Sequence, residues 1–350
     1  MGNFSYLNEL YFDVQQIHGR EYRANPIMRV YLGIITIVGS ISNIIVIFTI
    51  LVSPKMRTTT NIYSIQHATA CLLICSIHVP TGLHYSRIPS RPQSTIVCRI
   101  VAHCAIFSMA LSLASLAAIA VNRYILIFKG MAAYASLYDR KKISISFAVM
   151  WAWSLFMAVM PLTGLAVFGY NPKYSNCIFI VTDDIDSYIG VAIGVSLTGL
   201  PTAGVILYCY TTILVKFWKV KKKMNSLGPI TRRGTILSTD TQIATKTPEL
   251  RGGNTVSQRR NITQHNRSIK TVLSLIFMCV SHLTLWLPVI ILSCFDMKGT
   301  WPAYAYLVAG NLAYGSCLTQ PIIFIFVSKT HREAHRLTVT FQWNTLRNLR

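Results

Sequence analysis

Seven long windows of the sequence contain no charged residue, and this feature constrains the fold more than any other. Each window spans at least 23 residues, whereas a helix that crosses a bilayer needs about 20. The windows are 30–52, 61–83, 100–122, 143–168, 188–215, 271–295 and 302–327. The chain is therefore predicted to be an all-α membrane protein, a seven-transmembrane helix bundle with a short amphipathic eighth helix.

Buried helices of a soluble protein are the alternative, but such helices usually carry charge on one face. The whole chain has only 33 Lys and Arg and 11 Asp and Glu in 350 residues, about half the charged share of a soluble domain. Segment 1–29 contains Glu9, Asp13 and Arg20 and no apolar stretch. We therefore expect no cleaved signal peptide there, and the first span should act as its own signal anchor.

Lys and Arg collect on one set of the segments that alternate between the windows. Segments 1–29, 84–99, 169–187 and 296–301 hold 8 of them, and the other four segments hold 25. Positive residues stay cytoplasmic, so the N-terminus is predicted outside and the C-terminus inside, in the plasma membrane. Attraction to anionic lipid of the inner leaflet explains this positive charge. The expected partner of the basic segments is therefore the lipid bilayer and not nucleic acid.

Three parts follow from this topology. They are an extracellular tail 1–29, a membrane domain 30–327, and a cytoplasmic tail 328–350 with a short helix. The loop 216–270 between spans 5 and 6 is rich in Thr, Ser, Arg and Gly and is predicted to be disordered. The sequon Asn3-Phe4-Ser5 faces outside, so Asn3 is the expected glycosylation site.

The nine cysteines divide by the same topology. Seven lie inside the windows, and two, Cys98 and Cys177, lie in outer segments. Disulfides form in oxidising compartments. The sequence therefore predicts a Cys98–Cys177 disulfide, which would tie the loop between spans 4 and 5 to the top of span 3.

Several short motifs stand on particular spans. Arg123 follows Cys98 by 25 residues at the inner end of span 3. The motifs are Asn43, Trp151, Asn122-Arg123-Tyr124, Trp286-Leu287-Pro288 and Gln320-Pro321-Ile322-Ile323-Phe324. Together they resemble the rhodopsin-like (class A) family of G-protein-coupled receptors, from about Met28 to Arg336.

The resemblance implies a receptor that binds an extracellular ligand and activates a heterotrimeric G protein, with arrestin and kinases as further candidate partners. Arg123 would be a switch that contacts the G protein when span 6 swings out. Prolines in spans 5, 6 and 7 would permit kinks. The residues expected in this switch are Asn122, Arg123, Tyr124, Tyr210, Trp286, Pro288, Gln320, Pro321 and Phe324.

The sequence departs from the family where the family usually carries acids. Asn122 stands where an Asp or Glu usually precedes the Arg, and Cys71 stands where span 2 usually has Asp. Gln320 and Phe324 replace the usual Asn and Tyr of span 7. No acidic side chain lies in any window. These departures put the family's sodium site and its Asp–Arg contact in doubt.

The expected ligand pocket lies between the outer halves of the spans. Ala105 stands where amine receptors carry an Asp, and Tyr314 stands where opsins carry the retinal-binding Lys. Aminergic and retinal ligands are therefore disfavoured, and a neutral small molecule or a peptide is expected. A patchy likeness to melatonin receptors is carried by Asn122-Arg123-Tyr124, the segment 170–177 and Ala313-Tyr314. The candidate lining residues are His78, Thr81, His103, Ala105, Met109, Trp286, Ser293, Asn311 and Tyr314.

Other classes of protein remain as alternatives. A channel or transporter usually has polar or charged groups along a path or broken repeats, and the windows contain neither a charged residue nor a sign of such repeats. No motif of a hydrolase or metalloenzyme stands in the spans, so neither enzymatic activity nor a metal or cofactor is expected. A receptor-like seven-helix protein that has lost G-protein coupling is the alternative that the altered switch residues motivate.

Overall fold

The fold is seen in a computed structural model. It describes residues 25–86, 96–164, 167–171, 173–180, 194–226, 276–296, 301–327 and 329–340, together with positions 342 and 345. The N-terminal tail with Asn3 and most of the loop between spans 5 and 6 lie outside the described residues.

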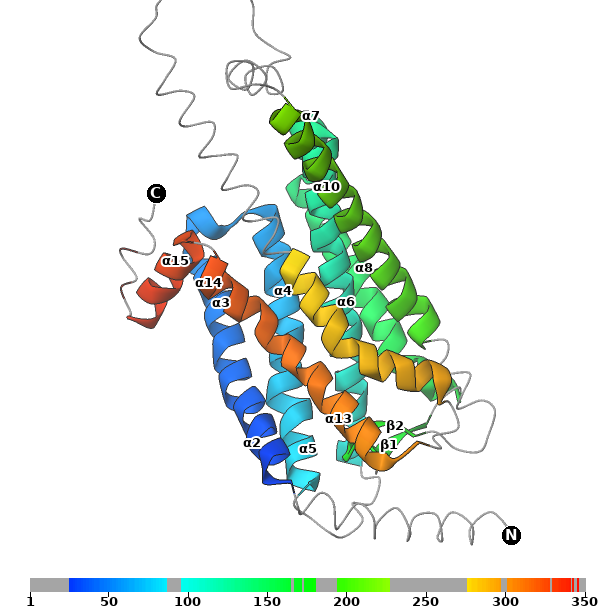
Figure 1. Cartoon of the computed structure of the whole chain (residues 1–350). Coiled ribbons are helices and arrows are strands. Elements are labelled where there is room, and N and C mark those ends of the chain that lie inside the picture. The colour runs from blue at the N-terminus through cyan, green and yellow to red at the C-terminus, as the bar shows by residue number, and fades with distance from the viewer. Residues whose placement is uncertain are drawn as a thin grey trace, which may run out of the picture.

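Seven helices in the described chain are long and apolar enough to cross a membrane. Figure 1 shows them side by side as one elongated bundle, which confirms the expected seven-helix membrane domain. We number them as spans 1 to 7. Their bounds are Pro26–Val52, Thr59–Tyr85, Ile96–Phe128, Arg140–Thr163, Ser196–Lys219, Ile276–Phe295 and Tyr304–Phe326.

Most spans consist of more than one regular segment. Span 1 contains α2 (Pro26–Ile34), η1 (Ile35–Gly39) and α3 (Ser40–Val52), and span 2 contains α4 (Thr59–Leu73), η3 (Ile74–His78) and α5 (Val79–Tyr85). Span 3 is α6 (Ile96–Phe128), and span 4 is α8 (Arg140–Val159) with η4 (Met160–Thr163). Span 5 lies in η5 (Val195–Gly199) and α10 (Leu200–Ser226), and span 7 in α13 (Ala303–Tyr314), η6 (Gly315–Leu318) and α14 (Thr319–Val327). The connections contain η2 (Pro54–Met56) and α7 (Gly130–Leu137), and α15 (Lys329–Val339) follows span 7.

Proline explains two of the irregular turns. A proline has no N–H for the carbonyl four residues earlier, and its ring clashes with that carbonyl. A π-helical turn, η5, precedes Pro201, and a 3-10 turn, η6, precedes Pro321. The carbonyl of Cys317, which Pro321 cannot satisfy, accepts a hydrogen bond of 3.1 Å from Asn43 Nδ2 instead. Asn43 of span 1 thereby compensates for the proline of span 7.

Span 3 runs through the middle of the bundle and packs against spans 2, 4 and 5. The apolar side chains on the outside of the bundle remain exposed, including Ile37, Val149, Leu155, Phe277 and Phe326. Water would oppose such a surface, but lipid tails accept it. The described chain is therefore built as a multi-pass membrane protein.

A two-stranded hairpin joins span 4 to the segment before span 5, and the sequence analysis did not foresee it. Strand β1 (Val167–Asn171) pairs antiparallel with β2 (Asn176–Ile180), with Asn171 opposite Asn176. Both strands are rich in the apolar and aromatic residues that favour strands, and an Asn-Pro sequence opens the turn between them. Figure 1 shows the hairpin at the end of the bundle where α2 and α13 begin. We call this the hairpin end.

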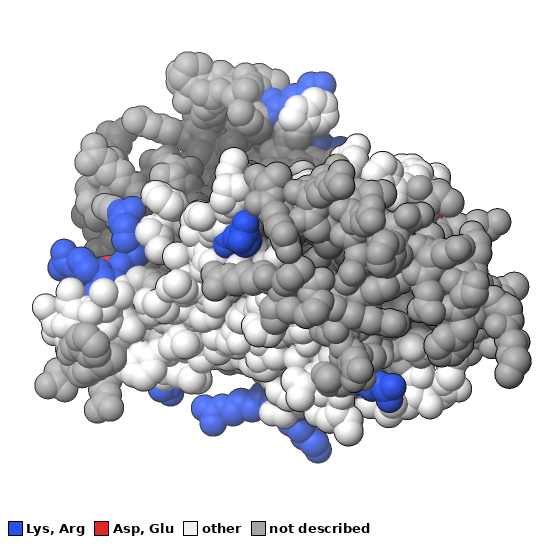
Figure 2. All heavy atoms as spheres, turned by 90° about the horizontal axis from the view of Figure 1, so that it is seen from below, with Lys and Arg blue, Asp and Glu red and all other residues white. Residues whose placement is uncertain are grey.

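Figure 2 shows the molecule from the hairpin end. The described Lys and Arg side chains there stand in small separate groups among white residues. The described residues of this end therefore form no continuous basic patch that could attract an acidic ligand.

Helices α6 and α10 continue well beyond the ends of their predicted windows. Helix α6 runs to Phe128, six residues past the window's end, and α10 runs to Ser226. The prediction that disorder begins at residue 216 is therefore wrong for residues 216–226. The window ends where charges begin, but Lys is a good helix former, and its long side chain can carry the ammonium group away from the apolar layer. Helix α10 therefore does not stop at its first charged residue.

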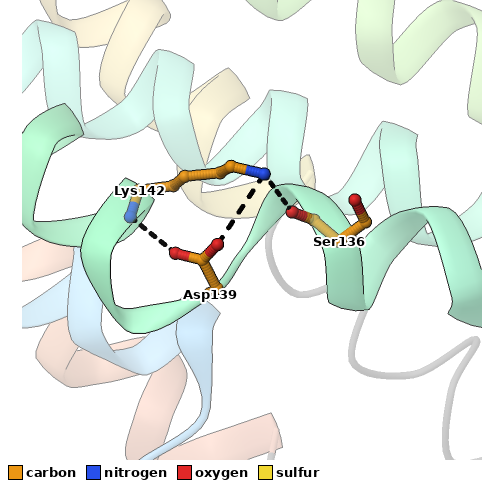
Figure 3. A network of polar contacts seen from close by, with 3 residues as sticks. All are labelled: Ser136, Asp139 and Lys142. Atoms are coloured by element: carbon orange, nitrogen blue, oxygen red, sulfur yellow. Dashed lines mark hydrogen bonds and ion pairs between the residues drawn. The ribbon is translucent and has the colours of Figure 1, made fainter.

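The connection between spans 3 and 4 is also helical and ends in a cap. The Asp139 carboxylate accepts a hydrogen bond of 2.8 Å from the Lys142 backbone N–H, which caps α8. The Lys142 ammonium lies 3.7 Å from the same carboxylate and donates to the Ser136 carbonyl (Figure 3). Caps of this kind contribute about 1 kcal/mol, whereas the half-exposed ion pair adds little.

The predicted disulfide between Cys98 and Cys177 is confirmed. Their Cα atoms lie 5.3 Å apart, and both residues are fully buried. Cys98 lies in the first turn of α6 and not in the segment before it, because the helix begins at Ile96. The bond holds β2 against span 3, where Phe168, Val101 and Ala102 form an apolar cluster with the two cysteines.

Loss of this disulfide should destabilise the protein. We expect Cys98→Ser to lower the free energy of unfolding by about 2–4 kcal/mol, because the bridge closes a long loop in the unfolded chain. The measurement is thermal unfolding of the purified full chain in detergent. Cys294→Ser removes an exposed free thiol and serves as the control. Unchanged unfolding together with an unchanged non-reducing peptide map would contradict the prediction.

Candidate functional site

A buried hydrogen-bonded cluster joins spans 2 and 7 near the hairpin end. The Tyr314 hydroxyl lies 2.9 Å from His78 Nε2, so the structure brings together two residues that the sequence predicted separately. Asn176 of β2 enters the same cluster, and its Nδ2 donates to the His78 carbonyl at 3.1 Å. All three side chains are at most 6% exposed. Sequence reasoning missed Asn176, although its position next to Cys177 could have pointed to it.

Two other predicted lining residues lie near this cluster. Met109 of span 3 packs against the apolar group that contains Tyr314 and Cys71. Asn311 is buried one helical turn before Tyr314 in α13. This part of the predicted pocket is therefore neutral, with amide, phenol, imidazole and thioether groups.

The remaining predicted lining residues are more scattered. His103 Nδ1 lies 2.6 Å from the Ala158 carbonyl of span 4, and its ring packs edge-on against Phe168 of β1. His103 thus contacts span 4 and the hairpin. Ala105 is buried inside span 3, Ser293 is half-buried in span 6, and Thr81 donates to the Ile77 carbonyl of its own helix.

Trp286 lies between spans 6 and 7. Its indole N–H donates to the Ser316 hydroxyl at 3.1 Å, and its ring stacks on His282 at a centroid distance of 6.0 Å. Ser316 belongs to η6, two residues after Tyr314. Trp286 is thus bonded to span 7 close to the His78–Tyr314 pair.

Two buried histidines occupy the centre of the bundle, and sequence reasoning did not single them out. The rings of His67 in span 2 and His282 in span 6 lie 5.7 Å apart. His67 Nδ1 lies 3.1 Å from the Ser112 hydroxyl, and its Nε2 lies 3.6 Å from the Cys71 thiol. Their presence in two charge-free windows was the available signal. The place where the family usually carries a span 2 Asp is thus a neutral cluster.

The opposite end of the bundle carries the Asn122-Arg123-Tyr124 segment. Asn122 is fully buried, and its carbonyl oxygen accepts from the Thr60 hydroxyl at 2.7 Å. Its amide nitrogen donates to the Tyr134 hydroxyl of α7 at 3.1 Å. The Asn122 amide therefore links span 3 to span 2 and α7, and it does not hold Arg123.

Arg123 is half-buried, and its Nε has no hydrogen-bond partner among the described residues. The next residue, Tyr124, stacks on Phe128 at 4.7 Å and lies 5.9 Å from the Tyr208 ring of span 5. Burial raises the pKa of the nearby Tyr138 phenol to about 12. The Tyr138 phenol therefore stays neutral far above physiological pH.

Tyr210 is buried between spans 3, 5 and 6, where the Cys279 thiol lies 3.7 Å from its hydroxyl. Tyr210 therefore faces the interior of the bundle. Pro288 is half-buried in span 6, two residues after Trp286. These residues come from different spans but contact the same interior.

The altered motif of span 7 also faces inward. Gln320 is fully buried and donates to the Ser64 carbonyl of span 2 at 3.1 Å. Pro321 is buried, and Phe324 packs in a cluster with Val46, Ile50, Ala334 and Leu337, which joins span 1 to α15. Gln320 thus links span 7 to span 2, and Asn43 links span 1 to span 7.

A seven-span bundle with a disulfide-tied hairpin at one end and an Asn-Arg-Tyr segment at the other has the architecture of a membrane receptor. The chain matches the family described as "7 transmembrane receptor (rhodopsin family)" over residues 42–324. It therefore belongs to the rhodopsin family of seven-transmembrane receptors. That family is a class of receptors, not of enzymes.

Several proteins are similar to this chain. The "G-protein coupled receptor moody" of Drosophila melanogaster is 25% identical over 346 residues, which cover 88% of this chain and 50% of that protein. This chain thus spans about half the length of that relative. The "Melatonin receptor type 1B-A" of Danio rerio is 25% identical over 191 residues, 55% of this chain and 65% of the receptor.

The fold itself is shared with a solved structure. Squid rhodopsin superposes with a TM-score of 0.73 at 19% sequence identity, over 93% of this chain and 87% of the rhodopsin chain. At that identity the similarity is one of fold alone.

The hydrogen bond between Tyr314 and His78 should contribute to stability. We expect Tyr314→Phe to lower the free energy of unfolding by about 1 kcal/mol, because a buried neutral hydrogen bond is lost. Tyr304→Phe in the same span is the matched control, since Tyr304 is 58% exposed. Thermal unfolding of both variants in one detergent is the measurement. Equal effects of the two substitutions would show that the buried bond contributes nothing measurable.

Proposed function

We propose that this protein is a receptor that binds an extracellular ligand at its hairpin end and promotes nucleotide exchange on a heterotrimeric G protein at the opposite end. The N-terminus then lies outside the plasma membrane and the C-terminus inside. The excess of Lys and Arg on the segments opposite the hairpin supports this orientation. The disulfide supports it too, because such bonds persist in an oxidising exterior.

The observation that carries the proposal is the state of Arg123. A cation that is partly withdrawn from water is costly unless it is paired and hydrogen-bonded. The oxygen and the nitrogen of the neighbouring Asn122 amide are hydrogen-bonded to Thr60 and Tyr134. A partner that presents carbonyl or carboxylate groups at this end would satisfy the Arg123 guanidinium. We assign that role to the G protein, and arrestin would compete for the same end.

The ligand site is placed at the His78–Tyr314 pair, with Met109 and Asn311 beside it. Its groups are neutral, so the expected ligand is a neutral small molecule or part of a peptide. The route to the other end runs through Ser316 to Trp286 and the span 6 proline. Kinases would act on the Ser- and Thr-rich segment between spans 5 and 6, and a glycan on Asn3 would lie outside.

Replacing Arg123 should abolish signalling while leaving the fold intact. We expect Arg123→Ala to reduce basal nucleotide exchange at least about tenfold, since a loss of only about 1.4 kcal/mol of coupling free energy suffices for that. The measurement is exchange by the purified chain with a panel of heterotrimeric G proteins. Arg332→Ala removes an exposed cation of α15 and serves as control.

Surface expression and thermal unfolding should be unchanged in Arg123→Ala. Equal losses of exchange and stability would mean that Arg123 supports the fold instead. Exchange that is absent from the wild type with every G protein and every ligand tested would favour a receptor-like protein that has lost coupling.

Replacing Asn122 by the acidic residue that is usual in the family should lower basal nucleotide exchange. Asn122→Asp keeps the side-chain size, and its carboxylate can accept from both the Thr60 and the Tyr134 hydroxyls. A charge-assisted bond is about twice as strong as a neutral one, so the new carboxylate should tie span 3 more firmly to span 2 and α7 and oppose a rearrangement of this end. We expect basal exchange to fall, and we expect wild-type activity to be insensitive to sodium because Cys71 offers no hard oxygen ligand. Two results would contradict this prediction. One is a wild type without basal exchange, and the other is wild-type activity that falls as the sodium concentration rises.

A further inference from the structure

The second half of the hairpin turn is buried in the bundle instead of standing in solvent. Loops with polar residues usually lie on the surface. Here Ser175 is 3% exposed and Asn176 is 1% exposed. Ser175 also has a positive φ of 48°, which is uncommon for a residue other than glycine. The segment 173–176, which we call the turn segment, therefore needs an explanation beyond joining two strands.

The Tyr174 ring packs against span 7 at Gly310. A Cβ atom at Gly310 would lie 3.0 Å from the Tyr174 ring, so the glycine makes room for the aromatic side chain. The Tyr174 ring also packs edge-on against Tyr306 at 5.5 Å, and Lys173 Nζ lies 5.0 Å from the centre of the Tyr306 ring. Burial raises the pKa of Tyr174, in keeping with a phenol enclosed by protein.

Asn176 uses a second glycine in the same way. A Cβ atom at Gly82 in span 2 would lie 2.7 Å from Asn176 Nδ2, which is closer than real contacts allow. That same amide nitrogen lies 3.3 Å from both His78 Nε2 and the Tyr314 hydroxyl. The amide thus fills the space between spans 2 and 7 and bonds the two residues on which the proposed ligand site rests.

We propose that the turn segment is a built-in ligand that occupies the outer site of the receptor. This inference rests on the proposed function, since it names what fills the proposed ligand site. Tyr174 supplies an aromatic ring over Gly310, and Asn176 supplies a neutral amide between His78 and Tyr314. An external ligand has to displace them, so it carries the same chemistry, an aromatic group and an amide, as a peptide does.

The occupied site has a thermodynamic consequence. The apparent affinity of an external ligand is reduced by the fraction of molecules whose site is open. Weakening the turn segment should therefore increase binding of a competitor of the same chemistry. A suitable probe is a cyclic peptide with the sequence of residues 171–176, which carries both the phenol and the amide.

The test compares binding of this peptide to the purified full chain with and without the native turn contacts. The variant is Tyr174→Ser with Asn176→Ala, and the control is Val167→Ala, an exposed residue of the same hairpin. We expect the peptide to raise the unfolding temperature of the double variant, and to leave wild type and control unchanged. An equal response of all three proteins, or no response of the double variant, overturns the inference.

A second measurement needs no variant that could misfold. Hydroxyl-radical labelling of wild type should modify Tyr304, which is 58% exposed at the hairpin end of span 7, far more than Tyr174. Equal labelling of the two tyrosines overturns the inference. Neither measurement involves a G protein, so a failure here leaves the Arg123 test of the proposed function untouched, and the reverse also holds.

Discussion

Backbone hydrogen bonding in the absence of water is the constraint on which the rest of this structure depends. In the apolar part of a membrane each N–H and C=O group needs a partner within the protein, which only helices and closed barrels provide. The spans meet this need except where proline removes a donor. At Pro321 the freed carbonyl of Cys317 is taken by Asn43 from another span. A local defect in one helix thus becomes a contact between two helices.

The same constraint explains the interior. The charge-free windows supply no ion pair to fix the spans, so neutral side chains cross-link them. His78 joins Tyr314, Gln320 joins Ser64, and Asn122 joins Thr60. Neutral hydrogen bonds contribute about 1 kcal/mol each, less than the charge-assisted bonds that acids would make. The spans are therefore held together by several moderate contacts and not by a few strong ones.

The two ends of the bundle have different chemistry for a physical reason. At the hairpin end a disulfide fixes β2 to span 3, and the turn segment fills the space between spans 2 and 7. At the other end the helices α6 and α10 extend past the apolar windows and carry basic side chains. At one end the turn segment thus lies between spans, whereas at the other end the Nε of Arg123 lacks a partner among the described residues.

The sequence by itself determined the seven spans, because charge is excluded from lipid, and the disulfide, because only two cysteines lie outside the windows. It also placed His78, Arg123 and Tyr314 on the correct spans. It did not show the hairpin, the insertion of the Asn176 side chain between spans 2 and 7, or the His67–His282 pair. Those features depend on which helix faces pack together although they are distant in sequence. They also depend on glycines such as Gly82, which leave room for a side chain of another segment. Only the tertiary structure decides such contacts, because hydropathy reports burial and not the identity of the partner.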